Sequence, residues 1–133
     1  MADMFSPEWM LAFMTEWNNE PELSDALAKI DFTSTIGYGF PDQENPSGVL
    51  VIENGKAVRA EPFNGQPLNW DMRAKPDNWQ KWFNEGIGMA GLGMATVSGK
   101  LKFKVGNYSA MIKDPRMAPP FIKSFSVMGR VKA

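Results

Sequence analysis

The chain has 133 residues, a net charge of -1, no cysteine and no histidine. The length suits one domain over residues 1–133, and the balanced charge argues against a nucleic-acid partner. Without cysteine and histidine the chain lacks disulfides, thiolate nucleophiles, the commonest general base and the commonest transition-metal ligand, so we expect no metal and no cofactor. We see no signal segment and no bilayer-length apolar run, which predicts a cytoplasmic protein without stable membrane insertion.

The composition is rich in flexible and aromatic apolar side chains, with 10 Met, 9 Phe and 5 Trp. Methionine fills irregular space and is common where a surface must adapt to varied apolar partners. Two interpretations stay open at this point. These side chains form either a core padded with methionine or an apolar cavity of adaptable shape.

The first expected elements are two helices, over residues 6–19 and 21–30. Ser6 is suited to cap the first helix, and Pro7 is suited to its first turn. An apolar stripe then recurs at the spacing of an amphipathic helix. It contains Trp9, Phe13 and Trp17.

Strands are expected next, over residues 32–40, 47–61 and 67–74. The middle segment predicts a hairpin, because Asn54 and Gly55 stand between two apolar runs and both tolerate positive φ. The alternation of side chains gives each strand one apolar face. The apolar residues that matter below are Ile36, Tyr38, Trp70 and Met72.

Two polar features of these strands have alternative interpretations. Tyr38 is either a core tyrosine with a bonded hydroxyl or a polar anchor for a ligand. Asp71 and Arg73 share the polar face of their strand, which predicts a surface ion pair rather than a catalytic site.

A third helix is expected over residues 75–86, with an apolar face of bulky aromatics. The stretch GIGMAGLG, residues 86–93, follows and matches G-x-G-x-x-G. A phosphate-binding loop of that kind follows a strand and opens a helix, whereas this stretch follows a helix, so we exclude a nucleotide site. We interpret it as a flexible or loosely helical connector. Its Met89, Leu92 and Met94 are expected to point into the interior.

The remaining chain predicts a strand over residues 98–107 and, after a turn, a last helix that contains Phe121, Phe125 and Met128. In the strand, apolar side chains alternate with Lys100, Lys102 and Lys104, and we interpret the lysines as the solvated face of an edge or near-edge strand. Four or five strands with one apolar face need one covering layer of helices. The sequence therefore predicts an α+β two-layer sandwich with a mostly antiparallel sheet.

The order of these elements resembles the sterol carrier protein type 2 family, also called the sterol-binding domain family. The likeness runs from about Trp9 to Met128, and its motif is the run from Gly99 to Lys104, followed after Val105 by Gly106-Asn107. The resemblance implies a five-stranded sheet, a short helix after the motif strand, and an apolar tunnel between the sheet and the helices. The tunnel of this family takes sterols, fatty acids, fatty acyl-CoA or phospholipids.

The resemblance further implies that the tunnel is lined by the sheet face, the third helix, the Gly/Met segment and the last helix. The expected ligand-binding residues are Phe13, Ile36, Tyr38, Trp70, Trp79, Trp82, Phe83, Met89, Leu92, Met94, Leu101, Phe103, Phe121, Phe125 and Met128.

We expect a non-catalytic protein that binds and transfers a lipid or another hydrophobic small molecule. Three alternatives stay open: an accessory protein that presents a hydrophobic substrate to a separate enzyme, a small enzyme without histidine or cysteine chemistry, and an interaction module with a filled core. A partner enzyme and a homodimer also stay open.

Overall fold

Five strands form one sheet in the computed structural model, which describes residues 3–132. Their order across the sheet is β3-β2-β1-β4-β5. The strands are β1 (Ser34–Gly39), β2 (Gly48–Glu53), β3 (Lys56–Glu61), β4 (Trp70–Arg73) and β5 (Lys102–Val105). The β1–β4 pair is parallel, and the other three neighbouring pairs are antiparallel. The predicted α+β class with a mostly antiparallel sheet is confirmed.

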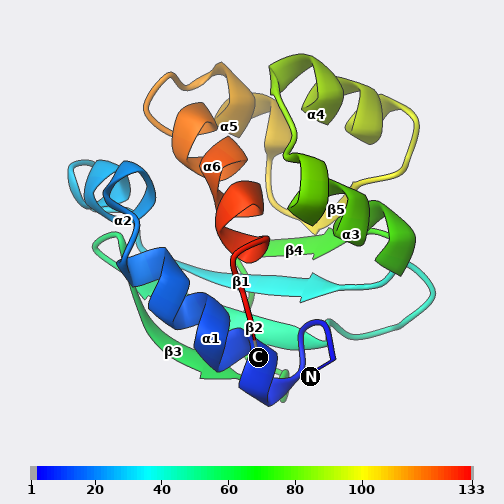
Figure 1. Ribbon diagram of the computed structural model, residues 1–133, viewed down its shortest axis with the longest axis horizontal. Helices are drawn as coiled ribbons and strands as arrows, with labels where there is room; N and C mark the ends of the chain where they lie inside the picture. The colour runs from blue at the N-terminus through cyan, green and yellow to red at the C-terminus, as the bar shows by residue number, and fades with distance from the viewer. Residues whose placement is uncertain (1–2, 133) are drawn as a thin grey trace.

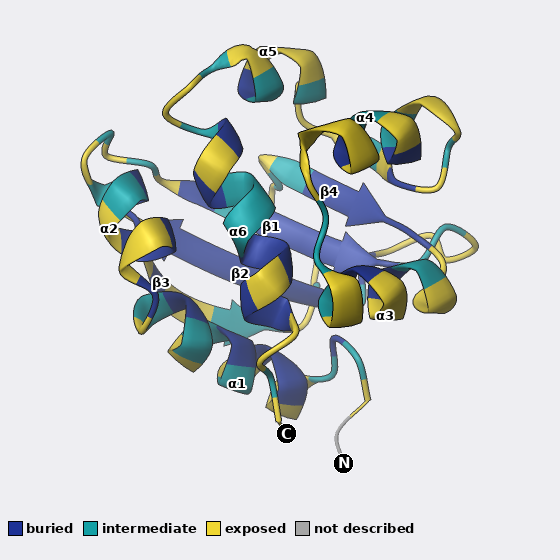
Figure 2. Cartoon of the chain, turned by 45° about the horizontal axis from the view of Figure 1, so that its top comes forward, coloured by how far each residue is buried: buried dark blue, intermediate teal, exposed yellow. Residues whose placement is uncertain are grey.

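Helices cover one face of this sheet (Figure 1). They are α1 (Pro7–Asn18), α2 (Pro21–Ala28), α3 (Pro76–Glu85), α4 (Met89–Val97), α5 (Tyr108–Lys113) and α6 (Ala118–Met128). Helix α6 lies between α2 and α3, and the buried sides of the helices are turned toward the sheet (Figure 2). Among residues 3–132, none of these helices combines the length and apolar composition needed to cross a bilayer.

Helix α1 forms as its sequence predicts and is fastened to the hairpin of β2 and β3. The Ser6 hydroxyl caps it by accepting a hydrogen bond from the Trp9 amide at 3.3 Å. The Asn18 side chain makes two 2.8 Å hydrogen bonds to the backbone of Ala57, one as donor and one as acceptor. The aromatic stripe of α1 is thereby held against the sheet.

The hairpin turn adopts the predicted conformation, with φ of 49° at Asn54 and 85° at Gly55. A Cβ atom on Gly55 would lie 2.3 Å from the backbone nitrogen of Ala28 at the end of α2. The Gly55 carbonyl also accepts a hydrogen bond from the Trp17 indole at 2.9 Å. Glycine is therefore required here both by the turn and by the close approach of α2.

The sheet face opposite the helices is covered by loops, which corrects the predicted surface location of Asp71 and Arg73. Both side chains are buried, at 5% and 1% exposure. The Arg73 guanidinium pairs with the Asp71 carboxylate, and its remaining N–H groups donate to carbonyls of the loop between β1 and β2. Pro46 of the same loop lies over Gly37, where a Cβ atom would be 3.1 Å from its ring.

Strand β5 forms an edge of the sheet, and Lys102 and Lys104 are exposed as predicted. The simple alternation expected there is interrupted, because the register of β4 and β5 shifts between Asp71 and Met72. Lys104 is the additional residue of this bulge, so Val105 lies 40% exposed instead of facing the helices.

The Gly/Met segment, predicted to be a flexible or loosely helical connector, forms a regular helix, α4. Leu92 of this helix is buried, as predicted, but Met89 and Met94 are 53% and 68% exposed. The prediction that these two methionines point into the interior is therefore wrong. Helix α5 follows β5, where the resemblance implies a short helix.

Candidate ligand-binding cavity

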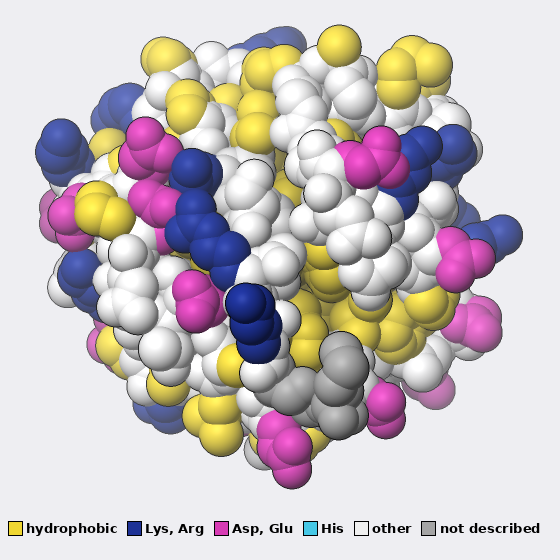
Figure 3. Space-filling view, viewed as in Figure 1, with side chains coloured by type: hydrophobic (Ala, Val, Ile, Leu, Met, Phe, Trp, Pro, Cys, Tyr) yellow, Lys and Arg dark blue, Asp and Glu magenta, His cyan; other side chains and the backbone are white. Residues whose placement is uncertain are grey.

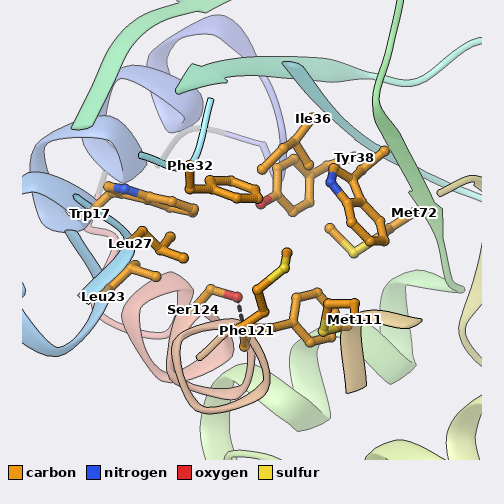
Figure 4. A pocket seen from close by; sticks show the side chains of 12 residues that line it. Trp17, Leu23, Leu27, Phe32, Ile36, Tyr38, Met72, Met111, Phe121 and Ser124 are labelled. Atoms are coloured by element: carbon orange, nitrogen blue, oxygen red, sulfur yellow. Dashed lines mark hydrogen bonds between the residues drawn. The ribbon is translucent and has the colours of Figure 1, made fainter. Parts of the chain in front are cut away.

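An apolar cavity of about 40 Å³ lies between the sheet and helices α2, α5 and α6 (Figure 4). Its 12 described lining residues include no charged side chain. They are Trp17, Leu23, Leu27, Phe32, Ile36, Tyr38, Trp70, Met72, Met111, Met117, Phe121 and Ser124.

The sheet side of the cavity comes from two neighbouring strands. Ile36 and Tyr38 alternate along β1, and in the parallel pairing they lie opposite Trp70 and Met72 of β4. Because side chains two residues apart share one face of a strand, these four side chains form one apolar surface. Phe32, just before β1, extends this surface toward α2.

The helix side comes from three helices and the segment between α5 and α6. Leu23 and Leu27 are one turn apart on α2, and Met111 of α5 lies opposite them. Met117 precedes α6, which itself provides Phe121 and Ser124. Figure 4 shows the side chains of these helices pointing toward those of the sheet.

Tyr38 is 1% exposed, and its ring packs against aromatic side chains of α1 and of the segment before it. The ring centroids of Phe5 and Phe13 both lie 5.6 Å from that of Tyr38. Burial raises the pKa of the Tyr38 hydroxyl well above its ordinary value, because the phenolate is poorly solvated there. The group is thus a neutral hydroxyl at physiological pH.

The Tyr38 hydroxyl makes no hydrogen bond to residues 3–132, whereas every fully enclosed polar side-chain atom of those residues has a partner. The hydroxyl oxygen is therefore in contact with the cavity, toward which it points in Figure 4. The Ser124 hydroxyl differs, because it donates to the Phe121 carbonyl at 2.5 Å. Tyr38 is also a core tyrosine, but not one whose hydroxyl the protein satisfies.

Four of the predicted ligand-binding residues line this cavity, namely Ile36, Tyr38, Trp70 and Phe121. Five others belong to an aromatic cluster between the sheet and helices α1, α3 and α6: Phe13, Trp79, Trp82, Phe83 and Phe125. The ring centroids of Trp79 and Trp82 are 5.6 Å apart, and the Trp79 indole donates to the Gly39 carbonyl at 3.0 Å. This cluster fills the interior that the resemblance assigns to the tunnel.

The remaining predicted residues lie away from the lining. Leu92, Leu101 and Met128 are buried in the hydrophobic core. Phe103 packs behind the cavity, with its ring centroid 6.0 Å from those of both Trp70 and Phe121. The exposed Met89 and Met94 of α4 are not among the lining residues.

Sequence reasoning missed eight of the lining residues. They are Trp17, Leu23, Leu27, Phe32, Met72, Met111, Met117 and Ser124. For Met72 a signal was present, since it shares the apolar strand face with Trp70. Leu23 and Leu27 also carried one, as the inward face of a short helix. For Met111, Met117 and Ser124 the alternation and spacing of apolar residues contain no such signal.

Ion pairs connect two of the helices around the cavity, α2 and α6. Glu20, which precedes α2, accepts from Arg130 at 2.8 Å, and Glu22 pairs with Lys123 at 2.9 Å. The Arg130 hydrogen bond, with further help from the Glu22 amide, holds the pKa of Glu20 below its ordinary value. Figure 3 shows acidic and basic side chains side by side over these helices.

The sheet with helices on one face, and an apolar cavity between the two layers, defines the architecture with which known proteins can be compared. The crystal structure of sterol carrier protein 2 superimposes with a TM-score of 0.76 over 98% of this chain and 100% of that protein, at 17% sequence identity. The chain therefore has the sterol carrier protein 2 fold.

Two further solved structures share this fold. One is a conserved hypothetical protein of Thermus thermophilus, described as possibly a sterol carrier protein, with a TM-score of 0.62, 16% identity and coverage of 95% and 90% of the two chains. The other is the UbiJ-SCP2 ubiquinone synthesis protein, with a TM-score of 0.55, 12% identity and coverage of 93% and 90%. No family model and no curated protein sequence matches the chain.

Proposed function

We propose that this protein binds and carries a lipid or another hydrophobic small molecule, without converting it, in the cavity between the sheet and helices α2, α5 and α6. One observation carries this proposal: a cavity with an apolar, uncharged lining lies between the sheet and the helices of a sterol carrier protein 2 fold. The proposed ligand classes are fatty acids, fatty acyl-CoA, phospholipids and sterol-like molecules.

The cavity is much smaller than the lipid ligands proposed for it. Ligand pockets usually measure roughly 300–1,000 Å³, whereas this cavity measures about 40 Å³. An unfilled cavity of 300 Å³ would cost about 7 kcal/mol at ~24 cal/mol per Å³, comparable to the stability of a whole domain. In the absence of ligand, the protein's own side chains are therefore expected to occupy most of the ligand volume.

Three methionines make such an exchange feasible. Met72, Met111 and Met117 border the cavity on the sheet and helix sides. An unbranched thioether side chain has several rotamers of similar energy, so it adapts to a ligand at low cost. A long acyl chain buried in their place gains about 0.8 kcal/mol for each methylene, which supports affinity without specific polar contacts.

An accessory role is the second candidate, favoured by the structural similarity to the UbiJ-SCP2 ubiquinone synthesis protein. In that case the cavity holds the substrate of a separate enzyme and presents it to that enzyme. The cavity chemistry is the same under both candidates, and they differ in whether a partner enzyme binds the loaded protein.

The proposed site is tested by filling it. Ser124→Leu places a larger apolar side chain in the lining, while Ser126→Leu makes the same change at an exposed position of the same helix. Hexadecanoate binding, followed by the fluorescence of Trp17 and Trp70, should weaken at least about tenfold in Ser124→Leu and stay unchanged in Ser126→Leu. Equal affinity in two folded variants would exclude this cavity as the binding site.

A further inference from the structure

The cavity contains one feature that an acyl-chain site does not need, a tyrosine hydroxyl that faces the cavity and has no hydrogen-bond partner among residues 3–132. Tyr38 is 1% exposed and lies on β1, the central strand of the sheet, with its oxygen in contact with the cavity. The Trp17 indole, which also lines the cavity, donates to the Gly55 carbonyl. Within residues 3–132 that buried donor has a partner, whereas the Tyr38 hydroxyl has none and is available to a ligand.

We infer that Tyr38 is a ligand-binding residue that donates a hydrogen bond to an uncharged oxygen, a hydroxyl or carbonyl, at the buried end of the ligand. This inference rests on the proposed function, because it assigns an orientation and a chemical class to the molecule in the same cavity. The ligand enters with its neutral oxygen first, and its hydrocarbon part contacts the apolar lining.

The absence of charged side chains from the described lining excludes an ionised ligand group next to Tyr38. The 12 described lining residues contain no lysine or arginine. A carboxylate next to Tyr38 would lose its hydration without a cation to replace it, which is far costlier than burying a neutral oxygen that is hydrogen-bonded. A surface groove over α2 and α6 does carry cations, namely Lys29 together with Arg116 and Lys123, which pair with Asp114 and Glu22. A fatty acid is therefore expected to keep its carboxylate outside, near this groove.

Ser124 distinguishes ligands with a hydroxyl from ligands with a carbonyl. Its proton is already donated to the Phe121 carbonyl, so its oxygen remains available as an acceptor on the opposite side of the cavity from Tyr38 (Figure 4). A ligand hydroxyl has a proton to donate to an acceptor of this kind, and a ligand carbonyl has none. Ser124→Ala should therefore weaken an alcohol more than a ketone.

The test uses three probes of equal chain length, dodecanol, methyl decyl ketone and dodecanoate. Tyr38→Phe removes the hydroxyl and keeps the ring. Tyr108→Phe, at the other tyrosine of the chain and outside the lining, is the matched control. Binding to each folded variant is measured by tryptophan fluorescence and calorimetry. Tyr38→Phe should weaken dodecanol and the ketone about tenfold, the usual worth of one hydrogen bond, and change dodecanoate less than about twofold.

The outcomes distinguish this inference from the proposed function. If the probes bind the wild-type protein but Tyr38→Phe leaves dodecanol and the ketone unchanged, the anchor is refuted and the carrier function stands. An equal loss for all three probes would also refute the anchor, because it would mean that the hydroxyl shapes the whole cavity. If no probe binds the wild-type protein, the carrier function fails and this inference fails with it.

Discussion

Arg73 and Asp71 form a buried bidentate ion pair on the sheet face opposite the helices. The Arg73 Nε donates to Asp71 Oδ1 at 2.7 Å, and Arg73 Nη2 donates to Oδ2 at 3.0 Å. The same guanidinium donates to the carbonyls of Phe40, Gln43 and Glu44. One side chain thus joins β4 to the loop that covers β1, the strand that carries Tyr38.

Loss of this guanidinium is predicted to destabilise the fold strongly. Arg73→Ala leaves the Asp71 carboxylate buried without a cation. It also removes a donor from three loop carbonyls, of which Phe40 keeps the Gln43 amide and Gln43 keeps Lys104. Such a change costs about 3–5 kcal/mol. Arg59→Ala, at an exposed arginine 3.9 Å from Glu61, should cost less than about 1 kcal/mol. Urea unfolding measures both, and a loss below about 1 kcal/mol for Arg73→Ala would contradict the structural role of the pair.

Removal of the Tyr38 hydroxyl is predicted to stabilise the protein that has no ligand bound. The Tyr38 side chain is 1% exposed and its hydroxyl has no partner among residues 3–132, and a poorly solvated polar group without a partner costs about 1–3 kcal/mol. Tyr38→Phe keeps the aromatic contacts with Phe5 and Phe13, so the free energy of unfolding should rise by about 1 kcal/mol. Chemical denaturation with Tyr108→Phe as control checks this, and a clear loss of stability would show that the hydroxyl is bonded.

The raised pKa of Tyr38 predicts a loss of stability in alkaline solution. An unfolded tyrosine ionises near its ordinary pKa of 10.0, while the folded hydroxyl stays protonated. Above that pH the unfolded chain binds fewer protons than the folded one, so the free energy of unfolding falls as the pH rises. Wild type should lose more stability than Tyr38→Phe between pH 9 and pH 11, two values chosen to bracket that ordinary pKa. Parallel slopes for the two proteins would mean that Tyr38 ionises normally.

For Glu20, the free energy of unfolding changes with pH in the opposite direction. Its pKa is lowered, mainly by the Arg130 hydrogen bond, so the pair stabilises the fold above the ordinary value of 4.5 and this contribution is lost as the pH falls through the folded pKa. Arg130→Gln should therefore reduce stability slightly at neutral pH and flatten its dependence below pH 4.5. Thermal unfolding across that range tests the pair, and an unchanged acid profile in Arg130→Gln would show that it contributes nothing.

Alanine substitutions at two glycines should change the free energy of unfolding in opposite directions. Gly55→Ala places a Cβ atom 2.3 Å from the backbone of Ala28 at a φ of 85°, so a loss of more than about 2 kcal/mol is expected. Gly93 lies inside α4, and a Cβ atom there has no neighbour within 4 Å. Gly93→Ala should stabilise the helix by about 0.5–1 kcal/mol. Similar effects of the two changes on unfolding would contradict the geometry of the hairpin turn.

Local patterns in the sequence were sufficient for most of the fold and for part of the site. Capping at Ser6, the Asn54-Gly55 turn and strand alternation depend on neighbours in the chain, and the structure confirms them. The locations of Arg73 and the Trp79 cluster depend on contacts between distant segments. Alternation marks Arg73 as polar-facing but does not reveal that residues 40–44 cover it.

The composition of α4 explains the error at Met89 and Met94. This helix is apolar all round its circumference, so the spacing of its residues cannot distinguish the buried side from the exposed side. The same limitation applies to the cavity. Periodicity predicts which side chains face inward. Whether those side chains pack together or leave a cavity depends on contacts between distant segments, such as those of α6 with the sheet and the other helices.

The measurement that tests the central claim most directly is native mass spectrometry of the purified protein, with organic extraction and lipid analysis of any molecule that co-purifies. A bound hydrophobic molecule is expected in wild type, lost in Ser124→Leu and retained in Ser126→Leu. This molecule is expected to carry an uncharged hydroxyl or carbonyl. A mass equal to that of the polypeptide, with no change in tryptophan fluorescence on addition of fatty acids, alcohols or ketones, would contradict the carrier function and favour an interior filled by tryptophan and methionine.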